Sequence, residues 1–146
     1  MTRKATICLL AVLCATVSGA ARADDAVVAA SVTVNPLDLS LSLSTLEGKA
    51  GDRVRARAAA TNLGSAELST VRLTLRADPS GLTIIGKNPR TIDALAGGAS
   101  AEVAWQLCGR EQASYVVLVR GTTGGFSAES AAQLLRITGI GRCPRA

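Results

Sequence analysis

The chain has 146 residues, a formal net charge of +5, only 2% aromatic residues and no histidine. This length fits a single domain, and the lack of histidine removes the usual general base at neutral pH and the commonest metal ligand. Serine–histidine and cysteine–histidine mechanisms are therefore excluded.

The acidic residues leave one catalytic possibility, because a pair of carboxylates is enough for glycoside hydrolysis. From residue 38 onward, however, they occur singly, at predicted turns or at outward strand positions, and no Asp-x-Asp cluster suggests a calcium loop. We interpret them as solvated surface groups. The sequence therefore predicts no catalytic residue, no metal site and no cofactor.

Residues 1–23 are typical of a signal peptide. Arg3 and Lys4 precede an apolar run at 5–17, and the ending Ala-Arg-Ala predicts cleavage after Ala23. The run is shorter than the roughly 20 residues of a membrane span, so a retained anchor is the weaker alternative, and we expect no stable membrane insertion of the mature chain. The protein is expected to be secreted, either to the periplasm or outside the cell.

Removal of this segment also changes the charge. It takes away three of the 16 basic residues and none of the 11 acidic ones, so the remaining 123 residues carry +2. With so small an excess and only three aromatic residues in the chain, a nucleic-acid partner is not expected.

Alternation of apolar and polar residues then predicts a series of short strands. Residues 24–30 are expected to form a flexible N-terminus. The clearest alternating or apolar segments are residues 37–46, 53–60, 71–76, 82–85, 101–107, 115–120 and 131–138. Shorter strands are expected at 31–34 and, as an edge strand, at 91–95.

The predicted connections are rich in glycine, proline and polar residues. They lie at residues 47–52, 62–69, 78–81, 86–90, 96–99 and 121–127, of which the last is the most flexible in composition. No segment has helical periodicity. Seven to eight strands at this spacing predict an all-β fold, an immunoglobulin-like antiparallel β-sandwich at residues 31–146 with a short C-terminal tail.

Four segments carry a resemblance to a known group of domains. Asn62-Leu63-Gly64, VRLTLRADPSGL, LAGGASAEVAWQL and SYVVLVRG together resemble immunoglobulin-like domains of bacterial secreted proteins. These are the CARDB type (cell-adhesion-related domain in bacteria) and the related NPCBM-associated type, which is appended to glycosidases. The resemblance covers residues 37–138. It implies an Asn-x-Gly turn after the second strand, a Pro-Gly corner after the third, and an inward-facing Trp105.

Two cysteines remain after the predicted cleavage, Cys108 and Cys143. Two cysteines in an exported protein predict one disulfide, and two free buried thiols are the alternative. If the strand order of the resembling domains holds, the C-terminal tail emerges at the same pole of the sandwich as Cys108.

Arginines form the one unusual surface pattern. Arg53, Arg55 and Arg57 share a face of one predicted strand, and Arg72 and Arg76 share a face of the next. Such a face is suited to an acidic polysaccharide, lipid head groups or a partner protein. The alternative is that these are ordinary outward positions, where long side chains cover the sheet and discourage edge aggregation.

The three aromatic residues fall into two groups. Trp105 and Tyr115 lie on the apolar side of their strands, which predicts core packing. Phe126 lies in the glycine-rich segment 121–127, where its ring is expected either to make contacts with a partner or to fold over the end of the sandwich.

These observations predict a secreted, non-enzymatic structural or binding module of the adhesion type, with an unknown protein or a cell-surface polysaccharide as partner. Contacts are expected from the end loops around Phe126 and residues 62–69, or from the arginine face. The alternative is an accessory or inhibitor domain that presents its loops to a secreted hydrolase.

Overall fold

The computed structural model describes residues 34–144, which form ten β-strands and no helix. The strands are β1 (Leu37–Leu43), β2 (Glu47–Lys49), β3 (Val54–Asn62), β4 (Leu68–Asp78), β5 (Leu82–Ile85), β6 (Arg90–Leu95), β7 (Ser100–Gly109), β8 (Ala113–Thr123), β9 (Phe126–Glu129) and β10 (Gln133–Thr138). In this part of the chain there is accordingly no apolar helix of membrane-spanning length. The predicted signal peptide, its cleavage site at Ala23, the segment 24–30 and residues 31–33 of the first predicted strand lie outside the described residues.

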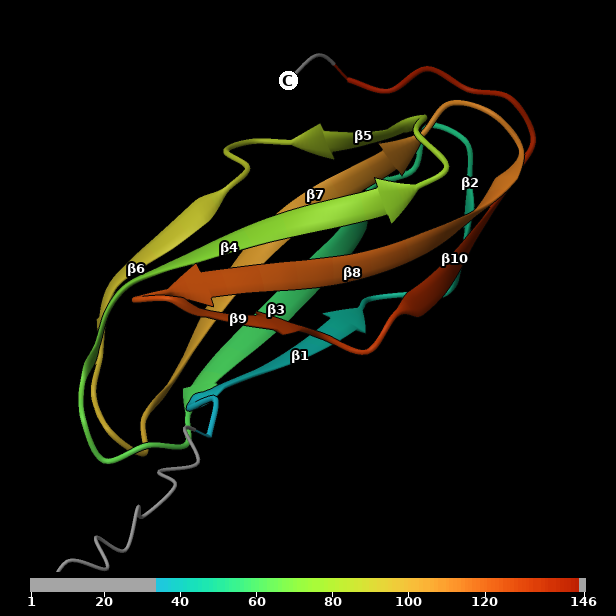
Figure 1. Ribbon diagram of the computed structural model, residues 1–146. Coiled ribbons are helices and arrows are strands. Elements are labelled where there is room, and N and C mark those ends of the chain that lie inside the picture. Colours follow the sequence, from blue (N-terminus) through green and yellow to red (C-terminus); the bar gives the residue numbers. More distant parts are fainter. Residues whose placement is uncertain (1–33, 145–146) are drawn as a thin grey trace, which may run out of the picture. The chain divides into compact units, whose positions relative to one another are not determined.

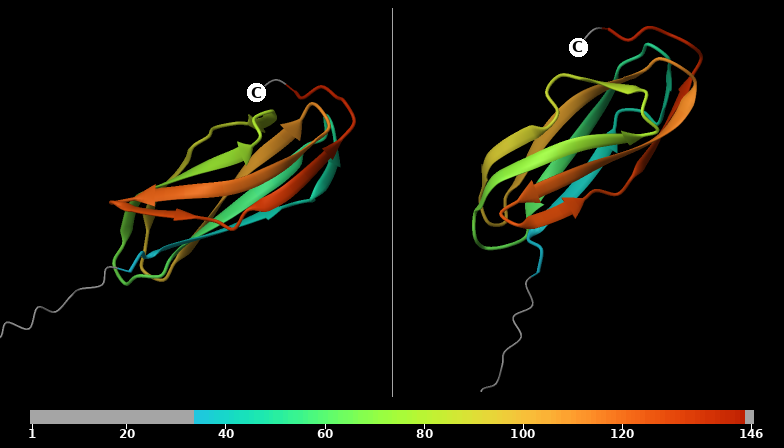
Figure 2. Two further views of the ribbon diagram at one scale, coloured as in Figure 1. Left: turned by 45° about the vertical axis from the view of Figure 1, so that its right-hand side comes forward. Right: turned by 45° about the horizontal axis from the view of Figure 1, so that its top comes forward.

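The strands form two sheets that pack against each other (Figure 1). The first sheet has the order β1-β3-β7-β5, and the second has the order β2-β10-β8-β4-β6 with β9 paired to β8. Both views in Figure 2 keep β4 and β8 in one layer and β3 and β7 in the other. The predicted all-β, immunoglobulin-like sandwich is confirmed, and all pairs except one are antiparallel.

The core follows from the period of two along each strand. In β1 the leucines at 37, 39 and 41 are buried and the polar residues between them are exposed. The inward positions of β3 are small, and Ala56 pairs with Trp105 on β7 while Ala58 pairs with Leu41 on β1. Small residues beside large ones let the side chains interdigitate at interior packing density. The side chains of Trp105 and Tyr115 are each only 1% exposed, as predicted from their place on the apolar side of their strands.

Two of the predicted connections are wrong. Residues 47–52 were expected to be a turn, but residues 47–49 form β2, which pairs in parallel with β10. Segment 121–127 was expected to be a flexible loop, but β8 continues to Thr123 and β9 starts at Phe126. Between them lie only Gly124 and Gly125, with φ of +47° and +92°, which suits the two-residue hairpin turns that need positive φ at both positions. With these two short strands, the described residues form ten strands, more than the expected seven to eight.

The second sheet leaves part of an apolar surface in contact with solvent. β8 lies between β10 and β4 in this sheet. Its outward Val116 is nevertheless 41% exposed, and Leu134, its partner on β10, is 54% exposed. Although β8 lies in the middle of the sheet, its outer face is therefore exposed to solvent and not covered by other elements of the described part of the chain.

The edge between the two sheets on the side of β5 and β6 is closed by polar side chains. Asn88 accepts a hydrogen bond from Leu75 N and donates one to Leu75 O, both at 3.0 Å, which extends the β4 ladder beyond the start of β6. Arg90 reaches from β6 to β7, where its Nη2 donates to Ala104 O at 3.3 Å. The two sheets are thus bridged where neither has a further strand.

The pole at the end of β7 carries the predicted disulfide, Cys108–Cys143. Gly141 N donates to Arg110 O, and Gly51 N donates to Gly109 O, so the tail and the β2–β3 turn are held at the same pole. The cysteines are 35 residues apart in sequence. Closing a loop of that length contributes about 3–4 kcal/mol in the chain-entropy account.

Candidate functional site

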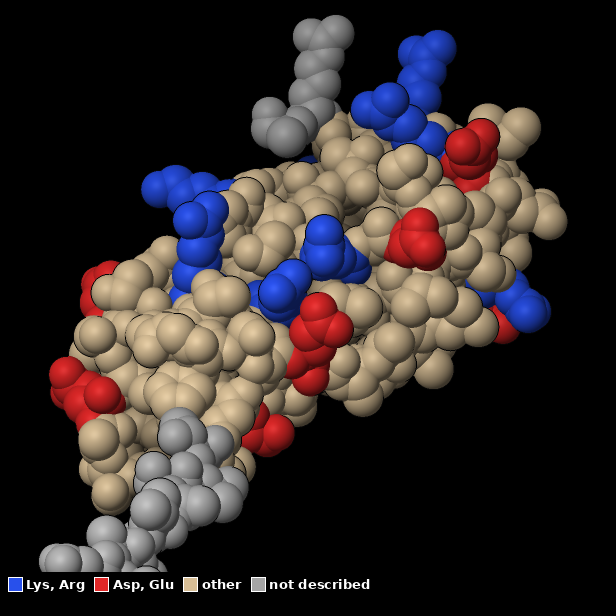
Figure 3. All heavy atoms as spheres, viewed as in Figure 1, with Lys and Arg blue, Asp and Glu red and all other residues tan. Residues whose placement is uncertain are grey.

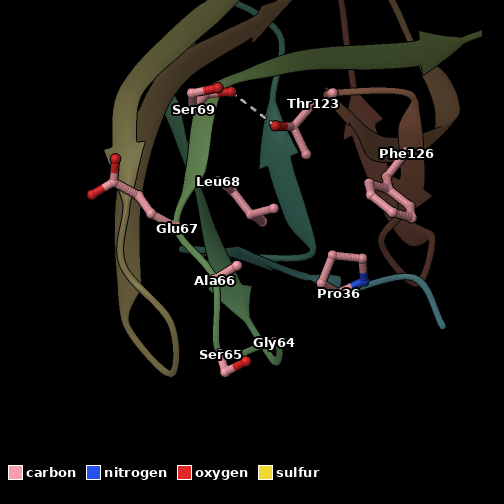
Figure 4. A pocket seen from close by; sticks show the side chains of 10 residues that line it. Pro36, Gly64, Ser65, Ala66, Glu67, Leu68, Ser69, Thr123 and Phe126 are labelled. Carbon is pink, nitrogen blue, oxygen red and sulfur yellow. Dashed lines mark hydrogen bonds between the residues drawn. The ribbon is translucent and has the colours of Figure 1, made fainter. Parts of the chain in front are cut away.

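Two of the segments expected to make contacts come together at the pole opposite the disulfide. The connection between β3 and β4 and the β8–β9 hairpin line one cleft of about 400 Å³. Figure 4 shows the two walls, with Leu68 and Ala66 from one segment and Thr123 and Phe126 from the other. The full lining is Pro36, Gly64, Ser65, Ala66, Glu67, Leu68, Ser69, Thr123, Gly124 and Phe126. We call this the end cleft.

Asn62 holds the first wall in place. Its side chain is fully buried, and its Nδ2 donates to Ala66 O at 2.7 Å and to Leu95 O at 2.9 Å. Its Oδ1 accepts a hydrogen bond from Gly64 N at 3.0 Å. The side chain therefore joins the end of β3 to the end of β6 in the other sheet and fixes the conformation of the loop before β4.

The neighbouring β6–β7 turn packs directly under this wall. A Cβ atom at Gly97 would overlap the backbone carbonyl group of Ser65, so only glycine permits this approach. Gly98 N also donates to Asn62 O at 2.9 Å. The Asn-x-Gly and Gly-Gly motifs noted in the sequence thus meet in space and support the same wall.

The second wall is tied to the first and to the chain entering β1. Thr123 Oγ1 donates to Ser69 O at 2.9 Å, and this bond is drawn in Figure 4. Asn35 Nδ2 donates to Ser127 O at 2.7 Å, and Leu63 N donates to Pro36 O at 2.7 Å. These contacts fix both sides of the end cleft to strands of the sandwich instead of leaving them on free loops.

Phe126 is half-buried at the start of β9 and lines the end cleft. Its side chain is therefore partly exposed, and the contact with a partner expected from the sequence stays a prediction.

Few of the groups that line the end cleft carry charge. Its lining is mainly carbon from Pro36, Ala66, Leu68 and Phe126, with hydroxyl groups at the edges. Glu67 is its single carboxylate, and Figure 4 shows that side chain pointing away from Thr123 and Phe126. Within residues 34–144 no group of three or more acidic residues, cysteines or histidines lies close enough to hold a metal ion. A pair of acid and base groups for hydrolysis is not among the residues that line the cleft.

The arginines are divided between the two sheets. Arg55 and Arg57 lie on β3 in the first sheet, with Arg53 just before it, and Arg72 and Arg76 lie on β4 in the second. All five side chains are exposed. Since the sheets pack face to face, the two groups point to opposite outer faces. Figure 3, seen from the side of β4 and β8, shows basic and acidic side chains next to each other on that face.

Comparison with known families gives one match. Residues 48–117 match the sequence profile of the NPCBM-associated, NEW3 domain of alpha-galactosidase. This covers β2 to the first half of β8 and includes the connection that forms the first wall of the end cleft. No curated protein sequence matches the chain.

Several solved structures are similar to this chain at low sequence identity. The cupredoxin domain of amoB from Nitrosocaldus yellowstonii matches with a TM-score of 0.55 and 10% identity, over 80% of this chain and 96% of that one. The sporulation control protein Spo0M from Bacillus subtilis has a TM-score of 0.49 and 8% identity, over 73% of this chain and 51% of that one. A mutant β-glucosidase from Listeria innocua in complex with laminaribiose has a TM-score of 0.48 and 14% identity, over 73% of this chain and 16% of that one.

The likeness to a cupredoxin domain concerns the fold alone. Blue-copper sites use two imidazoles and a thiolate. This chain has no histidine, and its two described cysteines are joined to each other. The residues present therefore do not fit a copper site. Among the resemblances expected from the sequence, the family comparison supports the NPCBM-associated type of β-sandwich domain for residues 48–117.

Proposed function

We propose that this chain is an exported, non-enzymatic accessory module that binds a partner protein through the end cleft. The observation that carries the proposal is the meeting of the β3–β4 connection and the β8–β9 hairpin around one apolar cleft. The matched family is described as a domain of alpha-galactosidase, which favours a secreted glycoside hydrolase as the partner over a general adhesion role.

Export is part of the same proposal. The sequence of residues 1–23 predicts a signal peptide with cleavage after Ala23, and the Cys108–Cys143 disulfide suits an oxidising compartment. The mature module then acts in the periplasm or outside the cell.

The shape of the end cleft suits an apolar side chain or a short apolar segment. Its volume of about 400 Å³ lies within the range of about 300–1,000 Å³ that is usual for ligand sites. Its walls are tied to strands by Asn62, Thr123 and Asn35, so little ordering cost is expected on binding. A protruding loop of a hydrolase is the occupant that these features favour.

Site-specific photo-crosslinking in the producing organism tests the proposal. A photoreactive amino acid replaces Ala66, whose side chain is exposed at the end cleft. The matched control carries it at Leu134, which is 54% exposed on the second sheet. We expect the first position, and not the second, to crosslink to a glycoside hydrolase identified by mass spectrometry. Crosslinks without any hydrolase, or the same products from both positions, would refute it.

A substitution gives the complementary result. Phe126→Ser removes the half-buried ring from the end cleft and should abolish the crosslink from position 66. Leu134→Ser, which removes a more exposed apolar side chain on the second sheet, should leave that crosslink unchanged.

A further inference from the structure

A second surface, separate from the end cleft, lies on the outer face of the first sheet. Arg53, Arg55 and Arg57 follow one another at every second residue, a spacing that corresponds to roughly 6.5–7 Å between successive Cα positions along a strand. We propose that this row, the β3 arginine row, binds an anionic polysaccharide whose carboxylate or sulfate groups pair with the guanidinium groups.

In the strand register no acidic residue lies directly opposite Arg55 or Arg57, and the carboxylate of β7 on this face, Glu102, pairs with Ala59, one outward position beyond Arg57. Arg55 lies between Ser44, which accepts a hydrogen bond from Arg55 N, and Gln106 on β7. Arg57 lies between Ser42 and Ala104. Among residues 34–144 the ion pair found is Arg136–Glu47, between β10 and β2 of the second sheet. The three arginines therefore keep their charge available for a ligand.

Two hollows flank the row and share Arg55. One of about 240 Å³ is lined by Ser42, Leu43, Ser44, Arg55 and Arg57. The other, of about 330 Å³, is lined by Arg55, Ile85, Arg90, Ala104, Trp105 and Gln106. Hydroxyl groups beside guanidinium groups suit a ligand that carries both acidic groups and sugar hydroxyls.

The second hollow has more hydrogen-bond donors than acceptors. Arg90 Nε and Trp105 Nε1 are buried and have no acceptor, although Arg90 Nη2 does donate to Ala104 O. The side-chain acceptor in the lining, Gln106 Oε1, already accepts from Arg53 Nη1 at 3.2 Å. Buried donors without partners are costly, but these two atoms are closed to solvent. The donor of this hollow that a ligand can reach is the exposed guanidinium group of Arg55.

The positions of the aromatic residues limit the class of ligand that the β3 arginine row can bind. Neutral glycans and single-stranded nucleic acids are commonly bound by stacking on exposed rings. Trp105 and Tyr115 are buried, and Phe126 lines the end cleft at the other pole. The arginine row thus offers charge and hydrogen bonds without a stacking surface. For a domain with a disulfide and a predicted signal peptide, acidic polysaccharide is the polyanion that this combination favours.

The test uses the oxidised mature chain, residues 24–146, and four polymers: polygalacturonate, heparin, single-stranded DNA and uncharged dextran. Biolayer interferometry at low salt should show binding to one or both acidic polysaccharides and none to dextran, and the binding should weaken as salt is raised. Arg55→Ser/Arg57→Ser should weaken it by at least about tenfold, because each lost charge-assisted hydrogen bond costs about that factor. The matched control, Arg72→Ser/Arg76→Ser, removes the same charge from the opposite face and should change affinity less than about twofold.

Several outcomes would overturn the proposal. Equal weakening by both double variants would mean that net charge alone is responsible. Binding to neither acidic polysaccharide, equal binding to dextran, or tighter binding to single-stranded DNA at equal charge concentration would each reject an acidic polysaccharide site. All four arginines are exposed, so both variants should fold, which circular dichroism checks. Phe126→Ser should not change polyanion binding, so this test can fail or succeed independently of the end cleft.

Discussion

Asn62 offers the sharpest test of how the end cleft is built. Its amide makes three hydrogen bonds, to Ala66 O, Leu95 O and Gly64 N, and the residue is completely buried. The substitution Asn62→Ala removes all three and leaves the buried Leu95 carbonyl without that partner. A loss of both stability and cleft geometry is expected.

The magnitude follows from the number of bonds. Net contributions of about 1 kcal/mol for each hydrogen bond sum to about 3 kcal/mol, a large share of the roughly 5–15 kcal/mol that stabilises a typical domain. With a urea dependence of about 2 kcal/mol per molar, the unfolding midpoint should fall by about 1.5 M. Asn62→Asp should cost at least as much, because it replaces a donor with a charge facing two carbonyl oxygens.

Urea unfolding of the oxidised mature chain, followed by the fluorescence of the single tryptophan, measures this loss. Leu63→Ala is the matched control, because Leu63 is the next residue, its side chain is 68% exposed, and it should change the free energy of unfolding by less than about 0.5 kcal/mol. If Asn62→Ala cost less than about 1 kcal/mol, or no more than Leu63→Ala, the proposed role of Asn62 would be refuted.

Three further results are expected. A thiol assay on the unfolded mature chain without reductant should find no free thiol, and Cys108→Ser/Cys143→Ser should lower stability by about 3–4 kcal/mol; two titratable thiols would contradict the disulfide. Gly97→Ala should destabilise the fold more than Gly98→Ala, because a Cβ atom at Gly97 would overlap the backbone of Ser65. A Cβ atom at Gly98 would meet no other atom, so that substitution should lower the free energy of unfolding only by the strain of its positive φ, about 1 kcal/mol. A lower urea midpoint for Gly98→Ala than for Gly97→Ala would contradict the packing of this turn. Trp105 should resist acrylamide quenching in the native state, since it is 1% exposed; ready quenching would place it outside the core.

Most strands could be predicted from the sequence because their faces differ so clearly in polarity. The leucines of β1 and the arginines beside buried alanines in β3 assign inward and outward positions without any tertiary information. β2 could not be predicted in this way. It is three residues long, contains a glycine, and exists because it pairs with β10, some 90 residues later. The β8–β9 hairpin did carry a signal, because adjacent glycines between two strands are typical of a tight turn.

The end cleft could be predicted only in part. Phe126 and residues 62–69 were both expected to make contacts, yet their meeting depends on β4 lying next to β8 in the second sheet. Strand order of this kind is set by long-range packing and has no local sequence signal. Arg90 is a similar case, because it lies at the end of a predicted turn, and only the two-sheet arrangement shows that it reaches β7.

Under the two proposals above, this small domain would act as an accessory module by binding at two separate surfaces. The end cleft lies where β3 ends and the arginine row lies where β3 begins, and the two share no residue. Both are attached to the same rigid strand, so a polymer on the row would not block a protein at the cleft. If the module holds a hydrolase at one pole and an acidic polymer near the other, as proposed, it would raise the concentration of the enzyme near the polymer, a gain in effective concentration that requires no catalytic residue.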